Sequence, residues 1–184
     1  MNFAKQSLLL LLPTLLLLNG CNKEEDVAPS IDNEAITTAT LQLTNAASTT
    51  EVITATIENL NTNADFSKAT LTLKPNTTYN ARVLLTDKTK TPALDVSAEI
   101  KKEVNEHLFI FTPVAGLNLT VTITDKDSNP TPGPFPVGLE SRMVTGAASA
   151  GKLRLVLKHQ PNTKNGTTTP GTTDLDTNFD VVVK

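Results

Sequence analysis

The sequence has one cysteine, no tryptophan and one tyrosine among its 184 residues. A single cysteine excludes an intramolecular disulfide, so the folded part must depend on a hydrophobic core. Aromatic residues make up only 4% of the chain, which leaves little surface on which sugars or bases could stack. The formal net charge is −3, so the chain lacks the basic excess with which nucleic-acid-binding proteins contact phosphates.

Motifs that carry catalysis are also missing. The sequence contains no Gly-x-Ser-x-Gly turn and no glycine-rich phosphate loop. Its two histidines, His107 and His159, have no obvious serine partner. The length corresponds to one domain rather than a multi-domain enzyme. We therefore expect a protein that is not an enzyme.

One long apolar run stands at the beginning of the chain. Nine of the eleven residues 8–18 are leucine, after a short segment that carries Lys5. A helix needs about 20 apolar residues to span a bilayer, and Pro13 interrupts this run. Residues 1–20 are therefore predicted to be a signal peptide.

The end of this run, Leu18-Asn19-Gly20-Cys21, resembles the lipobox of bacterial lipoproteins. The resemblance implies cleavage before Cys21, a diacylglyceryl group on its thiol, and a further acyl chain such as palmitate on the new amino terminus. Each buried methylene contributes about 0.8 kcal/mol, so two or more chains hold a protein on a membrane. Membrane lipid is then the first expected partner. The alternative is a secreted protein with one free thiol.

An acidic segment, Lys23-Glu24-Glu25-Asp26, follows Cys21. It resembles the export signal of surface lipoproteins of the Bacteroidota, which implies a position on the outside of the outer membrane. The alternative is a solvated tether on a periplasm-facing lipoprotein. We expect residues 21–33 to be a flexible tether with a reach of about 20 Å, and residues 34–184 to be the folded domain.

The rest of the chain has the composition of β-strands. Threonine is frequent, and aliphatic residues alternate with hydroxyl residues, which places them on opposite faces of a strand. The strands are expected at 39–44, 53–58, 69–74, 79–86, 108–112, 117–124, 141–145, 151–158 and 178–183. Residues 69–86 are expected to form strand, turn and strand, with Pro75 in the turn. The predicted fold class is all-β, an antiparallel β-sandwich of about eight or nine strands, immunoglobulin-like or transthyretin-like.

One helix and two loops are expected within this series. Ile100, Val104 and Leu108 recur every four residues, which predicts one short helix over 97–108, with Asp95 or Ser97 as its N-cap. Four prolines in 129–136 require an extended loop, and residues 164–173 form a second loop. Because loops at the end of a sandwich carry binding sites, an adhesin is expected to show an apolar or charged patch near 130–136.

Two patterns were weighed as metal sites. Glu99, Glu103 and His107 would share one helix face and offer three ligands. Lys101 and Lys102 are ordinary ion-pair partners for such a face, so we interpret it as solvated.

Asp125, Asp127 and Asn129 match the first half of an EF-hand calcium loop. Pro130 stands where that loop needs glycine and Pro136 where it needs glutamate, so a polar turn is favoured. A weaker calcium pattern consists of Asp174, Asp176 and Asp180. We expect no cofactor besides the lipid on Cys21, with calcium as the alternative.

Four segments, 73–79 (LKPNTTY), 98–107, 157–164 (LKHQPNTK) and 174–179, together resemble a family of small Bacteroidota lipoproteins, over about residues 33–184. Members are often labelled with a type 1 periplasmic-binding fold. That fold needs two lobes of alternating strands and helices, which this sequence does not predict. We therefore expect the kinship without that fold. The shared polar positions, expected to hold loops by hydrogen bonds, are Glu99, His107, His159, Asn162, Lys164 and Asp174.

Together these features predict an outer-membrane lipoprotein that faces the cell exterior. Its domain would be a non-enzymatic binding or structural module for an unknown protein or surface ligand. One alternative is a periplasm-facing accessory subunit of an envelope complex. Another is a metal-dependent hydrolase built on Glu99, Glu103 and His107.

Overall fold

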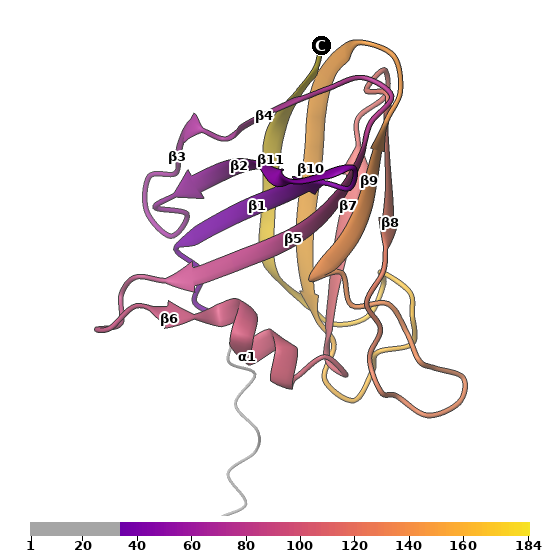
Figure 1. Cartoon of the computed structure of the whole chain (residues 1–184). Coiled ribbons are helices and arrows are strands. Elements are labelled where there is room, and N and C mark those ends of the chain that lie inside the picture. Colours follow the sequence, from indigo (N-terminus) through magenta and orange to yellow (C-terminus); the bar gives the residue numbers. More distant parts are fainter. Residues whose placement is uncertain (1–33) are drawn as a thin grey trace, which may run out of the picture. The chain divides into compact units, whose positions relative to one another are not determined.

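The computed structural model describes residues 34–184, which form two packed β-sheets and one short helix (Figure 1). The all-β sandwich predicted from the sequence is confirmed. The signal peptide, Cys21 and the segment from Lys23 to Asp26 lie outside the described residues. The elements are β1 (Thr38–Asn45), β2 (Ser48–Glu58), β3 (Asp65–Lys68), β4 (Thr70–Leu73), β5 (Thr78–Asp87), β6 (Leu94–Asp95), α1 (Val96–Lys102), β7 (His107–Pro113), β8 (Leu119–Ile123), β9 (Glu140–Thr145), β10 (Ser149–His159) and β11 (Thr172–Val183).

The first sheet has the strand order β3-β2-β1-β5-β9-β8, with β6 paired to β5. The second sheet has the order β4-β11-β10-β7. Neighbouring strands are antiparallel except for β4 and β11, which run parallel. This parallel pair is a departure from the fully antiparallel arrangement expected from the sequence.

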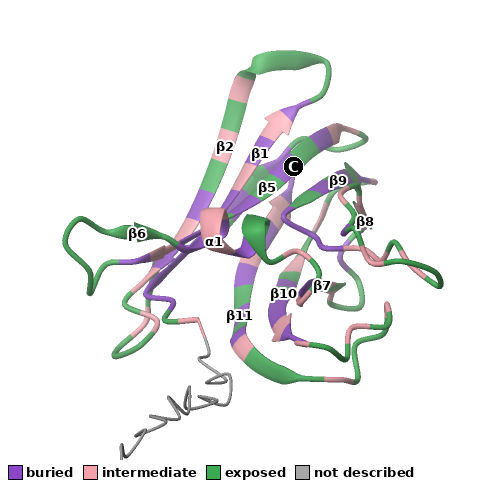
Figure 2. Cartoon of the chain, turned by 90° about the horizontal axis from the view of Figure 1, so that it is seen from below, coloured by how far each residue is buried: buried purple, intermediate pink, exposed green. Residues whose placement is uncertain are grey.

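The alternation of side chains along the strands produces the core. Leu41 and Leu43 of β1 are fully buried, whereas Gln42 between them is only half-buried. Figure 2 shows the same alternation of buried and more exposed residues along other strands. The largest fully buried side chains come from both sheets, and three of them are aromatic: Tyr79, Phe109 and Phe179. These three aromatic residues belong to the hydrophobic core, whereas Phe66 is exposed.

The predicted turn between residues 69–74 and 79–86 is instead a crossover between the sheets. β4 belongs to the second sheet and β5 to the first. The hydroxyl of Tyr79 accepts a hydrogen bond from the backbone N–H of Lys74 at 2.9 Å. Thr145 Oγ1 donates to the Lys74 carbonyl at 2.6 Å and accepts from the Thr77 N–H at 2.9 Å. Side chains of β5 and β9 therefore satisfy the backbone groups of the crossover.

Sequence periodicity overestimated the helix and missed two short strands, β3 and β6. Helix α1 ends at Lys102 rather than near Leu108, because the backbone from His107 onward pairs with β10. Its N-cap is Asp95, which accepts from the Ala98 N–H at 3.1 Å. No helix among residues 34–184 is long and apolar enough to span a membrane.

The crossover supplies a test of stability. Replacing Tyr79 by phenylalanine keeps the ring but leaves the N–H of Lys74 without its buried acceptor, which should cost about 1–3 kcal/mol. Urea denaturation measures the change. Thr72→Ser, at an exposed position of β4, is the control and should change little. An unchanged free energy of unfolding in Tyr79→Phe would contradict a role for this hydroxyl.

Candidate functional site

Ionisable side chains from five segments meet at one end of the second sheet. His107 begins β7 and His159 ends β10, and the two are directly paired across the strands. Asp174 lies near the start of β11, which also pairs with β10. Figure 1 shows these strand ends close to the end of α1. Glu103 caps α1, and Glu34 precedes β1. We call Glu34, Glu103, Glu106, His107, His159 and Asp174 the histidine cluster.

The two imidazole rings are stacked. Their centroids lie 4.7 Å apart and their planes differ by 4°. His107 is fully buried and His159 is 9% exposed. Gly171 helps to close this end, since a Cβ there would collide with the carbonyl of His159. The loop between β10 and β11 therefore returns directly against the histidine pair.

Each histidine has one nitrogen that faces a glutamate residue and one without a hydrogen bond, although His107 Nε2 lies 3.9 Å from the Glu34 carboxylate. His107 Nδ1 lies 3.1 Å from the carbonyl oxygen of Glu103, to which it can donate. His159 Nε2 lies 3.5 Å from the carboxylate of Glu106. The other nitrogens, His107 Nε2 and His159 Nδ1, are buried and have no hydrogen-bond partner among the described residues. Two lone pairs are therefore available inside the cluster.

The carboxylates of the cluster lack compensating charge. Both oxygens of Asp174 are buried without a hydrogen bond of good geometry. Burial raises the pKa of Asp174. Burial, with the nearby Glu103 and Asp174, also raises the pKa of Glu34. Burial lowers the pKa of His107. Burial is the largest cause in each case, and it favours the uncharged form of a group removed from water.

The distances permit shared binding of a cation. One ligand atom each from His107, His159 and Asp174 lie within 4.8 Å of one another. The same holds for Glu34, Glu103 and His107. Imidazole nitrogens with carboxylate oxygens form a donor set typical of zinc and related metals.

This cluster includes only part of the predicted metal site on Glu99, Glu103 and His107. The prediction of one shared helix face was wrong, because α1 ends before Glu103. Glu99 instead pairs with Lys102 at 2.9 Å. Glu103 and His107 do meet, together with Glu34. Glu34 and Glu106 were not predicted, because they join the cluster only through the fold.

In the segment of Asp125, Asp127 and Asn129, where a polar turn was favoured over a calcium loop, a lysine from another loop pairs with an aspartate. Lys164 Nζ lies 2.9 Å from Asp127 Oδ2, and both side chains are almost completely buried. Asp127 also accepts hydrogen bonds from Asn129 and from the Phe135 N–H, while Asp125 accepts from the Gly138 N–H. The two aspartates therefore bond to different groups, and the charge of Asp127 is compensated by the lysine.

This ion pair connects the two long loops. Although burial acts to raise it, the pKa of Asp127 is lowered, because Lys164 and hydrogen bonds from Phe135 and Asn129 stabilise the carboxylate. Lys164 Nζ also donates to the Val104 carbonyl at 2.7 Å. Beside the pair lies a polar pocket of about 280 Å³, lined by Asn105, Glu106, Asn129, Asn162 and Lys164.

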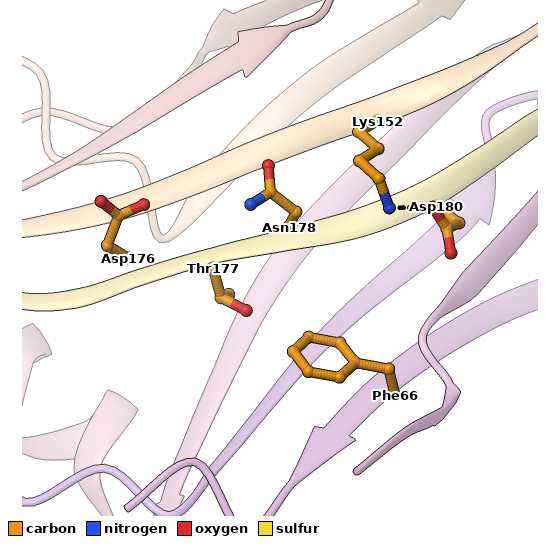
Figure 3. Close-up of a pocket in the computed structure, with 6 residues that line it drawn as sticks. All are labelled: Phe66, Lys152, Asp176, Thr177, Asn178 and Asp180. Atoms are coloured by element: carbon orange, nitrogen blue, oxygen red, sulfur yellow. Dashed lines mark hydrogen bonds and ion pairs between the residues drawn. The ribbon is translucent and has the colours of Figure 1, made fainter. Parts of the chain in front are cut away.

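A second pocket, of about 320 Å³, lies by β11 and is shown in Figure 3. Its Lys152 and Asp180 form an ion pair at 2.7 Å. Asp176 pairs with Arg154, which holds the pKa of that carboxyl below its ordinary value. Asp174, Asp176 and Asp180 therefore make three separate sets of interactions rather than one calcium site.

An apolar or charged patch was expected of an adhesin near residues 130–136, and no large apolar side chain is exposed there among the described residues. The large apolar side chains that are exposed lie elsewhere, at Val52, Phe66, Leu84, Leu94, Val114 and Val144. Phe135, in the loop itself, is half-buried. The histidine cluster is consequently the most distinctive site of the described residues.

No family model, curated protein or solved structure matches this chain. The resemblance to small Bacteroidota lipoproteins therefore stays a prediction. The two sheets also differ from the doubly wound lobes that the label of that family implies.

The buried ion pair gives a second test. Lys164→Met leaves the Asp127 carboxylate buried without a cation, which should cost about 3–5 kcal/mol. The matched control is Lys152→Met, which breaks an exposed pair and should cost less than about 1 kcal/mol. Adding Asp127→Asn to Lys164→Met removes the orphaned charge and should restore part of the loss. If urea denaturation shows that the two lysine substitutions lower the free energy of unfolding equally, the stabilising role of the buried Lys164–Asp127 ion pair is contradicted.

Proposed function

We propose that this chain is a lipoprotein of the outer membrane whose β-sandwich acts outside the cell as a non-enzymatic binding or structural module. The observation that carries the proposal is the segment Leu18-Asn19-Gly20-Cys21 directly after an apolar leader. Cys21 is also the only cysteine of the chain, at the position where lipid would be attached. The tether would then extend from this anchor to the sandwich.

The chemistry of the described residues supports a role in binding rather than catalysis. Each histidine has a glutamate beside one nitrogen, and neither hydrogen-bonds to a serine hydroxyl among residues 34–184. The hydrolase alternative loses one of its three ligands, because Glu99 pairs with Lys102. A nucleophile activated by a histidine base is therefore not supported at this site.

Exposure at the cell surface is proposed from Lys23, Glu24, Glu25 and Asp26. Their position immediately after Cys21 is that of an export signal in the lipoproteins they resemble. A domain facing the periplasm as an accessory subunit remains the competing proposal. The two differ in which side of the membrane exposes the sandwich.

The lipid anchor has a direct test. In the native protein, mass spectrometry should find Cys21 at the amino terminus, with acyl chains attached. Cys21→Ser should abolish both the modification and the cleavage, and should leave the protein outside the detergent-soluble lipoprotein fraction. Asn22→Ser, at the neighbouring position, is the control and should be lipidated normally. An unmodified Cys21 thiol, or an intact leader, would overturn the proposal.

Surface export is tested separately with protease on intact cells. The wild-type sandwich should be digested, whereas alanine at Lys23, Glu24, Glu25 and Asp26 should protect it without removing the lipid. A variant with these four residues in reverse order keeps the charge and separates a sequence signal from simple acidity. Digestion that is unchanged in the alanine variant would favour another export determinant.

A further inference from the structure

The histidine cluster has the arrangement of a metal site in its outer contacts as well as in its ligands. Metal-bound histidines usually donate their second ring N–H to a carbonyl or carboxylate, which fixes the ring and the tautomer. His107 Nδ1 faces the Glu103 carbonyl, and His159 Nε2 faces the Glu106 carboxylate. The nitrogens left over are the two that are buried inside the cluster without a partner. Both histidines are therefore held as metal ligands are.

No lysine or arginine of the described residues forms an ion pair with the buried carboxylates of the histidine cluster. Unpaired carboxylates are costly to bury. The neighbouring lysines interact elsewhere, since Lys164 pairs with Asp127 and Lys158 donates to the Gly171 carbonyl and the Thr173 hydroxyl. Among the described residues, neither Asp174 nor Glu34 therefore forms an ion pair with a lysine or arginine, although the charge of Lys158 acts to lower the pKa of Asp174. A bound cation would supply what both carboxylates lack.

We propose that the histidine cluster binds one divalent transition-metal ion, for which zinc matches the donor set best. The ligands are Glu34, His107, His159 and Asp174. Zinc binds imidazole nitrogen and carboxylate oxygen at about 2.0–2.2 Å, so two ligand atoms of one ion lie no more than about 4.4 Å apart. The present spacing, within 4.8 Å for His107, His159 and Asp174, is slightly wider. Because an ion lies in the plane of each imidazole that it binds and the two rings are parallel, one imidazole must rotate out of the stack before both nitrogens reach the ion.

The ion would join segments that backbone hydrogen bonds connect only in part. β10 already pairs with β7 and β11. Glu34 is different, because it precedes β1 of the other sheet. Binding of Glu34 and the histidines to one ion would tie the start of the domain to the second sheet. We infer a structural role, at the point where the tether reaches the sandwich.

The test uses the full chain in detergent, with Cys21→Ser in every sample so that no thiol competes for metal. After removal of metal with a chelator, added zinc should bind at one ion per chain, measured by elemental analysis after gel filtration. Zinc should also raise the Tm in a concentration-dependent manner, because it binds only the folded state. Co²⁺ should give the visible absorption of a protein-bound ion. Absence of bound zinc and of a Tm shift would overturn the proposal.

Asp174→Asn separates metal binding from ordinary packing. Without metal, this variant should melt at the same temperature as the parent or higher, because it removes an uncompensated buried carboxylate. With zinc, its Tm increase should be largely lost. The matched control is Asp176→Asn, two residues along β11, where the carboxylate pairs with Arg154. This control should keep the full zinc response.

Glu106→Gln tests the outer contact of His159 and should weaken zinc binding about 10–100-fold without abolishing it. A zinc response in Asp174→Asn equal to that of the parent would overturn the site even if zinc binds elsewhere. If Asp174→Asn does not fold, His159→Gln takes its place in the same comparison. Elemental analysis of the parent chain shows independently of either variant whether the protein binds one zinc ion.

Discussion

The pairing of β10 along both of its edges is the constraint on which the rest of the domain depends. β10 pairs with β11 from Ser149 to His159 on one side, and with β7 from Leu153 to His159 on the other. The register places His159 opposite His107, and it brings the start of β11 beside both. A shift of one residue would exchange the inner and outer faces of these strands. The core and the histidine cluster therefore depend on the same register.

Local pattern predicted most of the strands because one face of each is buried. The alternation in β1, β5 and β10 can be read from aliphatic residues at every second position. Sheet membership could not be predicted in this way. β4 and β5 are close in sequence but lie in different sheets, and the hydrogen bond of Tyr79 that supports the crossover depends on the complete fold. Similarly, the four-residue spacing of apolar residues predicted a helix up to Leu108. The helix ends at Lys102 instead, because the backbone from His107 onward pairs with β10.

The candidate site shows the same limit. Glu103 and His107 were considered as ligands because they are four residues apart on an expected helix face, which was interpreted as solvated, but α1 ends before both residues. Neither His159 nor Asp174 was predicted to lie beside His107. Their contact with His107 comes from strand register, which spacing along the chain does not reveal. Glu34 precedes β1 and reaches the cluster through packing of the two sheets.

Asp127 and Asp174 both carry a carboxylate shielded from water, but their surroundings differ. Asp127 is buried with Lys164, so its charge is compensated within the chain and its pKa is lowered. Asp174 is buried without such a partner, and its pKa is raised. Burial acts to raise the pKa of both carboxyl groups, and Lys164 with the hydrogen bonds from Phe135 and Asn129 reverses this effect at Asp127. The domain compensates Asp127 with its own lysine, whereas at Asp174 the proposed metal ion would take that role.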